Sequence, residues 1–242
     1  RRRALGTIAL CVATATAPVP AMDIETFLPR YAGRVESIET YQVRICQWSV
    51  ADDELDAKIM NFYYAAPDRI RIDVIEGTRG AGASGLLTDE GRIGIRAGSR
   101  LIPIRLTFDL DHPLVTTNRG RTFLDGSFRG ILRQLERYAE SCTVTADPET
   151  TSIVVTIEPC GTADRQVVTF DAAALIPTSS DTYADGVHVE HVEWSSFSEG
   201  DMLPDRVFDL STSQRELERN RVARLSFRPV TRSERAAARL DE

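Results

Sequence analysis

Three consecutive stretches in the first third of the chain alternate apolar and polar residues, which is the pattern of half-buried β-strands. Successive side chains of a strand point to opposite sides, so each stretch carries one apolar face. Short acidic or proline-containing segments separate the stretches, as turns between neighbouring strands would. The pattern therefore predicts an antiparallel meander over residues 41–74. Its alternating apolar positions are Tyr41, Val43, Ile45, Met60, Phe62, Tyr64, Ile70, Ile72 and Val74.

Two other stretches repeat apolar residues at the spacing of an α-helix. The first covers residues 24–38 and has Asp23 as its N-cap. The second covers residues 128–140, with Leu132 and Leu135 on its apolar side and arginines on the other. Each helix must bury its apolar side, and the apolar face of the sheet offers the surface for this. We expect a mainly β fold with short helices packed on the sheet.

The remaining elements are predicted to be shorter strands and one long loop. Residues 106–121 show no clear period and are predicted to be the loop. No linker interrupts the chain, so we expect residues 22–242 to form a single domain with a charged tail from about residue 231. Further strands are expected around residues 86–87, 93–95, 143–145, 153–157, 166–170, 187–194, 207–210 and 222–227.

The first 21 residues have the layout of a secretory signal peptide. Three arginines come first, residues 4–16 are uncharged and mostly apolar, and residues 17–21 are small residues and prolines. The apolar run is shorter than the about 20 residues that span a bilayer. We therefore expect export to the periplasm, with a mature protein that begins at Met22. The alternatives are an amphipathic first helix, or a lipid attached at Cys11, for which the preceding Leu10 is too large.

Composition excludes several classes of protein. Over 242 residues the chain is 42% hydrophobic and 27% charged, which is typical of a globular protein. Neither a disordered chain nor a polytopic membrane protein has this balance. The net charge of −7 offers no broad basic surface for a phosphate backbone, so no nucleic-acid partner is expected.

Two segments match ligand-binding loops in part but lack the context that such loops need. Residues 80–85 fit G-x-G-x-x-G, but Gly91 and Gly94 follow too closely for a helix that could hold a pyrophosphate. Residues 52–56 are acidic, but they lack the alternating ligands and the glycine of a calcium loop. Both segments are predicted to be turns between strands.

The three histidines indicate no catalytic or metal site. His188 and His191 are three residues apart on a predicted strand, so their side chains would point to opposite faces unless a bulge intervenes. His112 lies near Asp109 and Asp111, as a general base and its orienting carboxylate would, but no nucleophile can be assigned to it. We expect no catalytic residues, no metal and no cofactor, and a protein that is not an enzyme.

Cysteine spacing leaves two alternatives open. Beyond the predicted signal peptide, the cysteines are Cys46, Cys142 and Cys160. The last two flank a pair of predicted strands that could bring them together, and a disulfide closing such a loop contributes about 3 kcal/mol. In the alternative, all three are buried thiols. The spacing of cysteines and histidines does not indicate a structural zinc site.

Five segments follow one another in an order that is typical of a known protein family. The first predicted helix ends in VESIETY at residues 35–41, and FYYAAPDRIRI at residues 62–72 joins an aromatic strand, a proline and an arginine-bearing strand. LLTDEG at residues 86–91 joins an apolar pair, an aspartate and a glycine, and residues 170–178 and 202–208 supply two further segments. In this order the segments resemble the LolA-like superfamily of bacterial lipoprotein-sorting and lipid-carrier proteins.

The resemblance implies an open antiparallel half-barrel, a curved sheet whose concave face is covered by short helices and shields acyl chains. It implies a monomeric carrier in the periplasm or cell envelope, with lipid or lipoprotein acyl chains, and envelope membrane proteins, as partners. The lipoprotein carrier of the family has an arginine immediately before the proline, where this chain has Ala66. The candidate lipid-binding residues are Val43, Ile45, Met60, Phe62, Tyr64, Ile72, Val74, Leu132 and Leu135.

An apolar cleft can bind such a ligand without any polar motif, because burial of each CH₂ group contributes about 0.8 kcal/mol. The alternative function is a structural or sensor module of the envelope, built on the same sheet but with a filled core. The two functions differ in whether the apolar face of the sheet borders an open cleft or a closed core.

Overall fold

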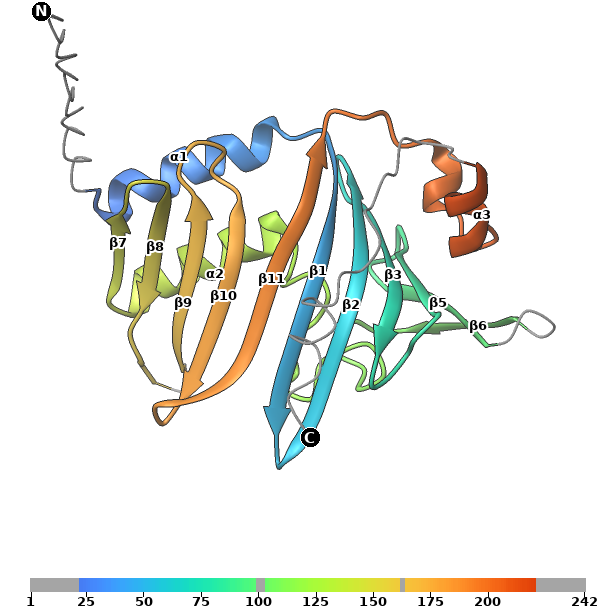
Figure 1. Cartoon of the computed structure of the whole chain (residues 1–242), viewed down its shortest axis with the longest axis horizontal. Helices are drawn as coiled ribbons and strands as arrows, with labels where there is room; N and C mark the ends of the chain where they lie inside the picture. Colours follow the sequence, from blue (N-terminus) through green and yellow to red (C-terminus); the bar gives the residue numbers. More distant parts are fainter. Residues whose placement is uncertain (1–21, 99–102, 162–163, 221–242) are drawn as a thin grey trace, which may run out of the picture.

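Strands dominate the fold. The computed structural model describes residues 22–98, 103–161 and 164–220, so the predicted signal peptide, the expected strand at 222–227 and the tail from residue 231 lie outside the described residues. Within the described residues, eleven strands form one antiparallel sheet that is not closed into a barrel, which confirms the expected fold class (Figure 1). The strands are β1 (Thr40–Ala51), β2 (Glu54–Ala65), β3 (Arg69–Gly77), β4 (Ser84–Leu87), β5 (Ile93–Gly98), β6 (Pro103–Phe108), β7 (Val144–Pro148), β8 (Ser152–Ile157), β9 (Arg165–Asp171), β10 (Pro177–Ala184) and β11 (Val187–Glu199).

The strand order joins two meanders in the middle of the sheet. The order is β6-β5-β4-β3-β2-β1-β11-β10-β9-β8-β7, so all neighbours except β1 and β11 are also consecutive in the chain. Those two strands pair antiparallel, with Ile45 opposite Trp194 and Trp48 opposite His191. The first and last described strands therefore lie side by side at the centre, and β6 and β7 form the two edges.

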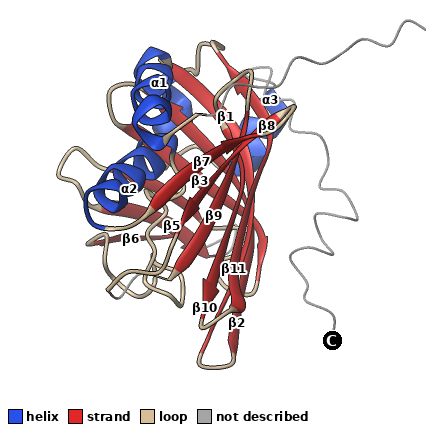
Figure 2. Ribbon diagram, turned by 90° about the vertical axis from the view of Figure 1, so that its left-hand side faces the viewer, coloured by secondary structure: helices blue, strands red, loops and turns tan. Residues whose placement is uncertain are grey.

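Two helices cover one face of the sheet, which we call the inner face and which carries Phe62. Helices α1 (Ile24–Ser37) and α2 (Phe128–Ser141) lie on the same side of the sheet, as Figure 2 shows. Asp23 and Ser127 are their N-caps, each accepting a hydrogen bond from the backbone N–H three residues on, at 2.7 and 2.9 Å. Both predicted helices are confirmed.

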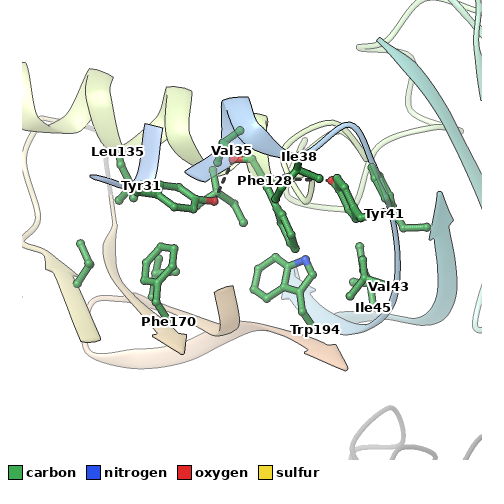
Figure 3. Packing of buried hydrophobic residues seen from close by; sticks show 14 of the residues in the cluster. Tyr31, Val35, Ile38, Tyr41, Val43, Ile45, Phe128, Leu135, Phe170 and Trp194 are labelled. Atoms are coloured by element: carbon green, nitrogen blue, oxygen red, sulfur yellow. Dashed lines mark hydrogen bonds between the residues drawn. The ribbon is translucent and has the colours of Figure 1, made fainter. Parts of the chain in front are cut away.

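The main core lies between these helices and the inner face (Figure 3). The Tyr31 hydroxyl of α1 donates to the Phe128 carbonyl at 3.0 Å, and the Tyr41 hydroxyl of β1 accepts from the Phe128 backbone N–H at 3.3 Å. Trp194 of β11 donates through Nε1 to the Gly126 carbonyl at 3.0 Å. These bonds fix the start of α2 against α1 and over the junction of the two meanders.

The opposite face, which we call the outer face, is covered in part by the end of the described chain. The 3₁₀-helix η1 (Asp205–Phe208) follows β11, and α3 (Gln214–Asn220) lies on the side of the sheet away from α1 and α2 (Figure 2). Tyr63 of β2 belongs to a small second core there, with Leu203, Val207 and Leu217.

Two expectations about elements are wrong. The strand expected at residues 207–210 is replaced by the end of η1 and a turn, because the carbonyls of Val207 and Asp209 accept hydrogen bonds from the buried Arg71 side chain. The loop expected at residues 106–121 begins later, since β6 continues through Phe108 and pairs with β5.

Candidate functional site

An apolar cavity of about 250 Å³ lies on the inner face of the first meander. Strands β2 to β6 line one side of it, and the loop that follows β6 lines the other. The strands contribute the apolar residues Met60, Ile72, Val74, Ile93, Ile95, Ala97, Leu106 and Phe108, and the loop contributes Leu114, Val115 and Phe123.

A glycine lets the side chains of neighbouring strands meet inside this part of the sheet. A Cβ atom at Gly85 would lie only 3.1 Å from side-chain atoms of both Ile72 and Ile93. A larger residue at Gly85 would therefore push into the cavity lining. Ala97 of β5 also contributes little volume, so the lining is wide at the centre of β4 and β5.

Polar contacts connect the loop that follows β6 to the rest of the molecule. Asn118 donates through Nδ2 to the Glu54 carbonyl at 2.6 Å and accepts from the Ser49 hydroxyl at 2.6 Å. Arg119 forms an ion pair with Asp164, which lies near the start of β9. The loop is thus held against the β1–β2 turn and against the second meander.

Three basic side chains also line the cavity, and each has an acidic partner. Lys58 and Arg79 both contact Asp56, at 2.9 and 2.7 Å, and Arg121 contacts Glu190 at 2.7 Å. Burial disfavours the charge of Asp56, but hydrogen bonds from Arg79 and Lys58 outweigh burial and hold the pKa of that carboxyl below its usual value.

Glu190 shows the opposite balance. Burial raises the pKa of its carboxyl, although the charges of Arg121 and Arg119 act against this. The cationic side chains of the lining are thus paired with carboxylates, and the apolar residues provide the surface that an apolar ligand could contact.

The predicted lipid-binding residues lie on the inner face or on α2, which covers it, and they fall into two groups. Three of them, Met60, Ile72 and Val74, line the cavity and also border the main core. The others do not line it and belong to the main core between the sheet and the helices or pack against it: Val43, Ile45, Phe62, Tyr64, Leu132 and Leu135. The structure therefore brings the predicted residues to one side of the sheet without gathering them around one cavity.

Sequence reasoning missed the β5, β6 and loop residues of the lining. Leu106 and Phe108 fell in the segment predicted to be a loop. The alternation of Ile104, Leu106 and Phe108 with Arg105 and Thr107 is the signal that could have revealed them.

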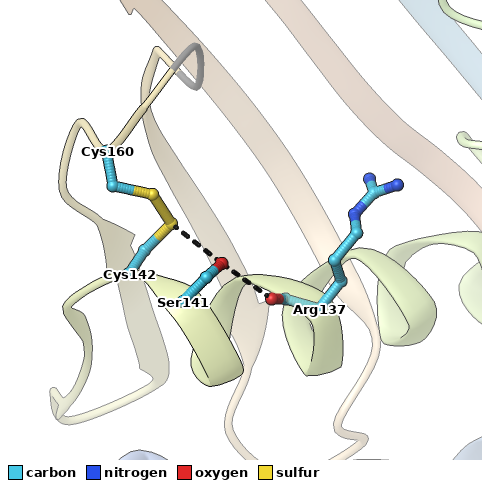
Figure 4. Close-up of a disulfide and its surroundings, with 4 residues drawn as sticks. All are labelled: Arg137, Ser141, Cys142 and Cys160. Atoms are coloured by element: carbon cyan, nitrogen blue, oxygen red, sulfur yellow. Dashed lines mark hydrogen bonds between the residues drawn. A yellow bond between two sulfur atoms is a disulfide. The ribbon is translucent and has the colours of Figure 1, made fainter.

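A disulfide joins Cys142 to Cys160 (Figure 4). Cys142 is the C-cap of α2, and its backbone N–H donates to the Tyr138 carbonyl at 2.7 Å. Cys160 lies beyond β8, with its Cα 5.5 Å from that of Cys142. The bridge therefore connects the end of α2 to the edge of the second meander, while Cys46 is buried and remains a thiol.

His188 and His191 were expected on opposite faces unless a bulge intervenes, and the structure has such a bulge. The pairing of β10 with β11 shifts register between Thr182 and Tyr183, which places a bulge between the two histidines. Both rings consequently reach the same carboxylate oxygen, Oδ1 of Asp181, on the outer face.

The other motifs are turns or loop contacts. The glycine-rich segment at residues 80–85 turns the chain from β3 into β4, with Gly80 and Gly82 at positive φ. Asp52 and Asp53 form the turn between β1 and β2. The His112 ring lies 4.4 Å from the Phe108 ring, beside the cavity.

No model of a known protein family matches the chain, and no curated protein matches it. Among solved structures, the chain is similar to a LolA superfamily protein from Nitrosomonas europaea, with 12% identity, a TM-score of 0.40, and coverage of 79% of this chain and 99% of that chain. It is also similar to an outer membrane lipoprotein-sorting protein domain from Vibrio parahaemolyticus, with 10% identity, a TM-score of 0.39, and coverage of 76% and 95%.

A third similar structure is an uncharacterized conserved protein from Thermus thermophilus, with 7% identity, a TM-score of 0.47, and coverage of 75% and 92%. The Nitrosomonas and Vibrio proteins carry names of the family that the sequence motifs resemble. Because the identities and TM-scores are this low, these structures do not indicate a function for this chain.

Among the described residues, no helix has both the length and the apolar character that a membrane crossing requires.

Proposed function

We propose that the chain is a carrier that shields the acyl chain of a lipid or lipoprotein in the cavity of the first meander. The observation that carries this proposal is the cavity itself, which is lined by apolar residues of β2 to β6 and of the loop after β6. The resemblance of the sequence to LolA-like proteins implies the same class of ligand. The signal-like layout of the first 21 residues supports export, and the periplasm is the location that we propose for the carrier.

The free energy of such binding is adequate without further chemistry. Transfer of an eight-carbon segment from water into the cavity contributes roughly 6 kcal/mol, at about 0.8 kcal/mol per CH₂ group. A larger hollow of about 490 Å³ near the turns after β8 and β10 suits an acyl chain less, since Asp164, Arg165 and Asp185 line it.

Filling the cavity tests the proposal. We expect the full chain to bind a fluorescent fatty acid saturably. The change Ala97→Phe places an aromatic ring among the lining residues of β5, and we expect at least tenfold weaker binding from it, with an unfolding free energy within about 1 kcal/mol of wild type. Absence of saturable binding by wild type, or wild-type binding by Ala97→Phe, would contradict the carrier function.

Two phenylalanine truncations provide a matched comparison. Phe108 lines the cavity, so Phe108→Ala should weaken fatty-acid binding and cost less stability than the about 3–5 kcal/mol typical of a packed aromatic site. Phe62 is fully buried in the main core, so Phe62→Ala should cost that full amount while its folded fraction still binds. Urea unfolding and the fatty-acid titration, carried out on both variants, separate the two effects.

A further inference from the structure

We propose that Asp181, His188 and His191 form a binding site for a zinc ion on the outer face of the sheet. The site lies on the face opposite the cavity and does not depend on the carrier function. Each of the three residues offers one ligand atom, and these atoms all lie within 4.8 Å of one another. Imidazole nitrogens with one carboxylate are a ligand set that zinc accepts in proteins.

The β-bulge creates this convergence. On a regular strand, residues three apart face opposite sides, but the register shift beside Tyr183 turns His188 to the same face as His191. The Asp181 Oδ1 atom lies 2.9 Å from His188 Nε2 and 2.7 Å from His191 Nδ1. The carboxylate comes from β10 and both rings from β11, so paired strands hold all three ligands.

Aromatic neighbours hold the histidine rings in place. The Trp48 ring centroid is 4.7 Å from that of His188 and 6.2 Å from that of His191, and the Tyr183 ring stacks on His188 at 4.9 Å. These contacts limit the rotation of both rings, which lowers the entropy that is lost when an ion binds.

The site has the accessibility and the room that an exchangeable ion requires. The side chains of Asp181, His188 and His191 are 24%, 37% and 24% exposed. Ligand atoms at the corners of a tetrahedral zinc site are about 3.3 Å apart, as follows from metal–ligand bonds of about 2.0–2.2 Å. The present nitrogen–oxygen separations therefore need to open by only a few tenths of an ångström, and a water molecule would complete the coordination.

Direct titration tests the site. The full chain, expressed without a polyhistidine tag and stripped with a chelator, should bind one Zn²⁺ in isothermal titration calorimetry. Each of His188→Ala, His191→Ala and Asp181→Asn should weaken this binding about tenfold or more, since even loss of a supporting residue costs tenfold to a hundredfold. The third histidine of the chain provides the matched control, and His112→Ala should bind as wild type does.

A second readout locates the ion. Cu²⁺ prefers the same imidazole ligands and quenches nearby indole fluorescence, and Trp48 lies beside the site whereas Trp194 is buried on the inner face. Stoichiometric Cu²⁺ should quench the tryptophan fluorescence of wild type but not that of His188→Ala, which lacks a ligand. Trp48→Phe should still bind Cu²⁺, but its remaining fluorescence should not be quenched. Unchanged zinc affinity in His188→Ala and His191→Ala, loss of binding in His112→Ala, or no stoichiometric binding by wild type would each overturn the proposal.

Discussion

Among single residues, Arg71 makes the most demanding set of contacts. Its side chain is fully buried, and Nε donates to Asp73 at 2.9 Å. The two terminal nitrogens donate to Ser84 and to three backbone carbonyls of the segment that contains η1, at 2.9–3.2 Å. Burial raises the pKa of the Asp73 carboxyl, although the charge of Arg71 opposes this. Arg71 therefore offsets part of the free-energy cost of burying the charged form of Asp73.

Removal of this arginine should therefore be costly. We expect Arg71→Ala to lower the unfolding free energy by about 3–5 kcal/mol, because a buried carboxylate and several carbonyls lose their partner. Urea unfolding measures the loss, and limited proteolysis should cut Arg71→Ala within residues 204–217 before wild type.

Arg69, on the same strand, provides the matched control. It forms an exposed ion pair with Asp205, and the side chains of Arg69 and Asp205 are 45% and 94% exposed. The Cζ atom of Arg69 lies 4.7 Å from the centroid of the Phe208 ring. Arg69→Ala should therefore cost less than about 2 kcal/mol. Equal losses in the two variants would show that the buried hydrogen bonds of Arg71 contribute little.

The sequence predicted the direction of Arg71 but not its role. Alternation along residues 69–74 puts Arg71 on the face opposite Ile72, as the structure has it. Its carbonyl partners lie 136 to 141 residues further along the chain, in a segment where the pattern indicated a strand. A local period carries no information about a partner at that separation, so the burial of this arginine could not be predicted.

Between elements, the docking of α2 depends on Gly130. A Cβ atom at this position would lie 2.0 Å from the backbone oxygen of Leu124, in the segment that leads into the helix. The close approach lets the Ser127 cap and the Trp194 contact with Gly126 form together. Gly33, inside α1, has no atom within 4 Å of the corresponding position.

The same substitution should thus have opposite effects in the two helices. We expect Gly130→Ala to destabilise by about 1–3 kcal/mol or more, because the backbone before α2 must move. Gly33→Ala should stabilise by up to about 1 kcal/mol, because alanine favours a helix and space is available. Thermal and urea unfolding of both variants measure this, and a neutral Gly130→Ala would show that the segment before α2 adapts freely.

Periodicity predicted elements with strong apolar patterns and missed those built from polar pairs. Both helices and most of the strands were visible in this way. Strand β10 was not predicted, because its inward positions include the polar residues Ser180 and Thr182. These two side chains are buried, and hydrogen bonds with Gln166 and Glu190 satisfy their hydroxyl groups. The convergence of His188 and His191 was not predicted for a related reason. The bulge that turns His188 depends on how β11 pairs with β10, which the local sequence pattern does not reveal.

Across the whole sheet, the two edges differ in what holds them. The β7 edge contacts α1 and is connected to α2 through the Cys142–Cys160 bridge nearby. Among the described residues, the β6 edge pairs only with β5 and keeps Ile104 and Leu106 about half exposed. The centre is bound on both sides, since β1 pairs with β2 and with β11 along most of its length.

Backbone hydrogen exchange should reproduce this gradient. We expect amides of β1, β2 and β11 to exchange most slowly, β7 and β8 to be intermediate, and β6 to exchange fastest, because local opening costs least where an element has fewest partners.

A reductant should then speed exchange in β7 and β8 and leave β6 unchanged, since the bridge closes a loop across 18 positions whose cross-link contributes about 3 kcal/mol. Mass spectrometry of peptides from the exchanged protein, with and without reductant, measures both effects. The double variant Cys142→Ser with Cys160→Ser should show the faster β7 and β8 exchange without reductant and respond no further to it. Equal protection of the two edges in the oxidised protein would mean that α1 and the disulfide do not secure the β7 edge.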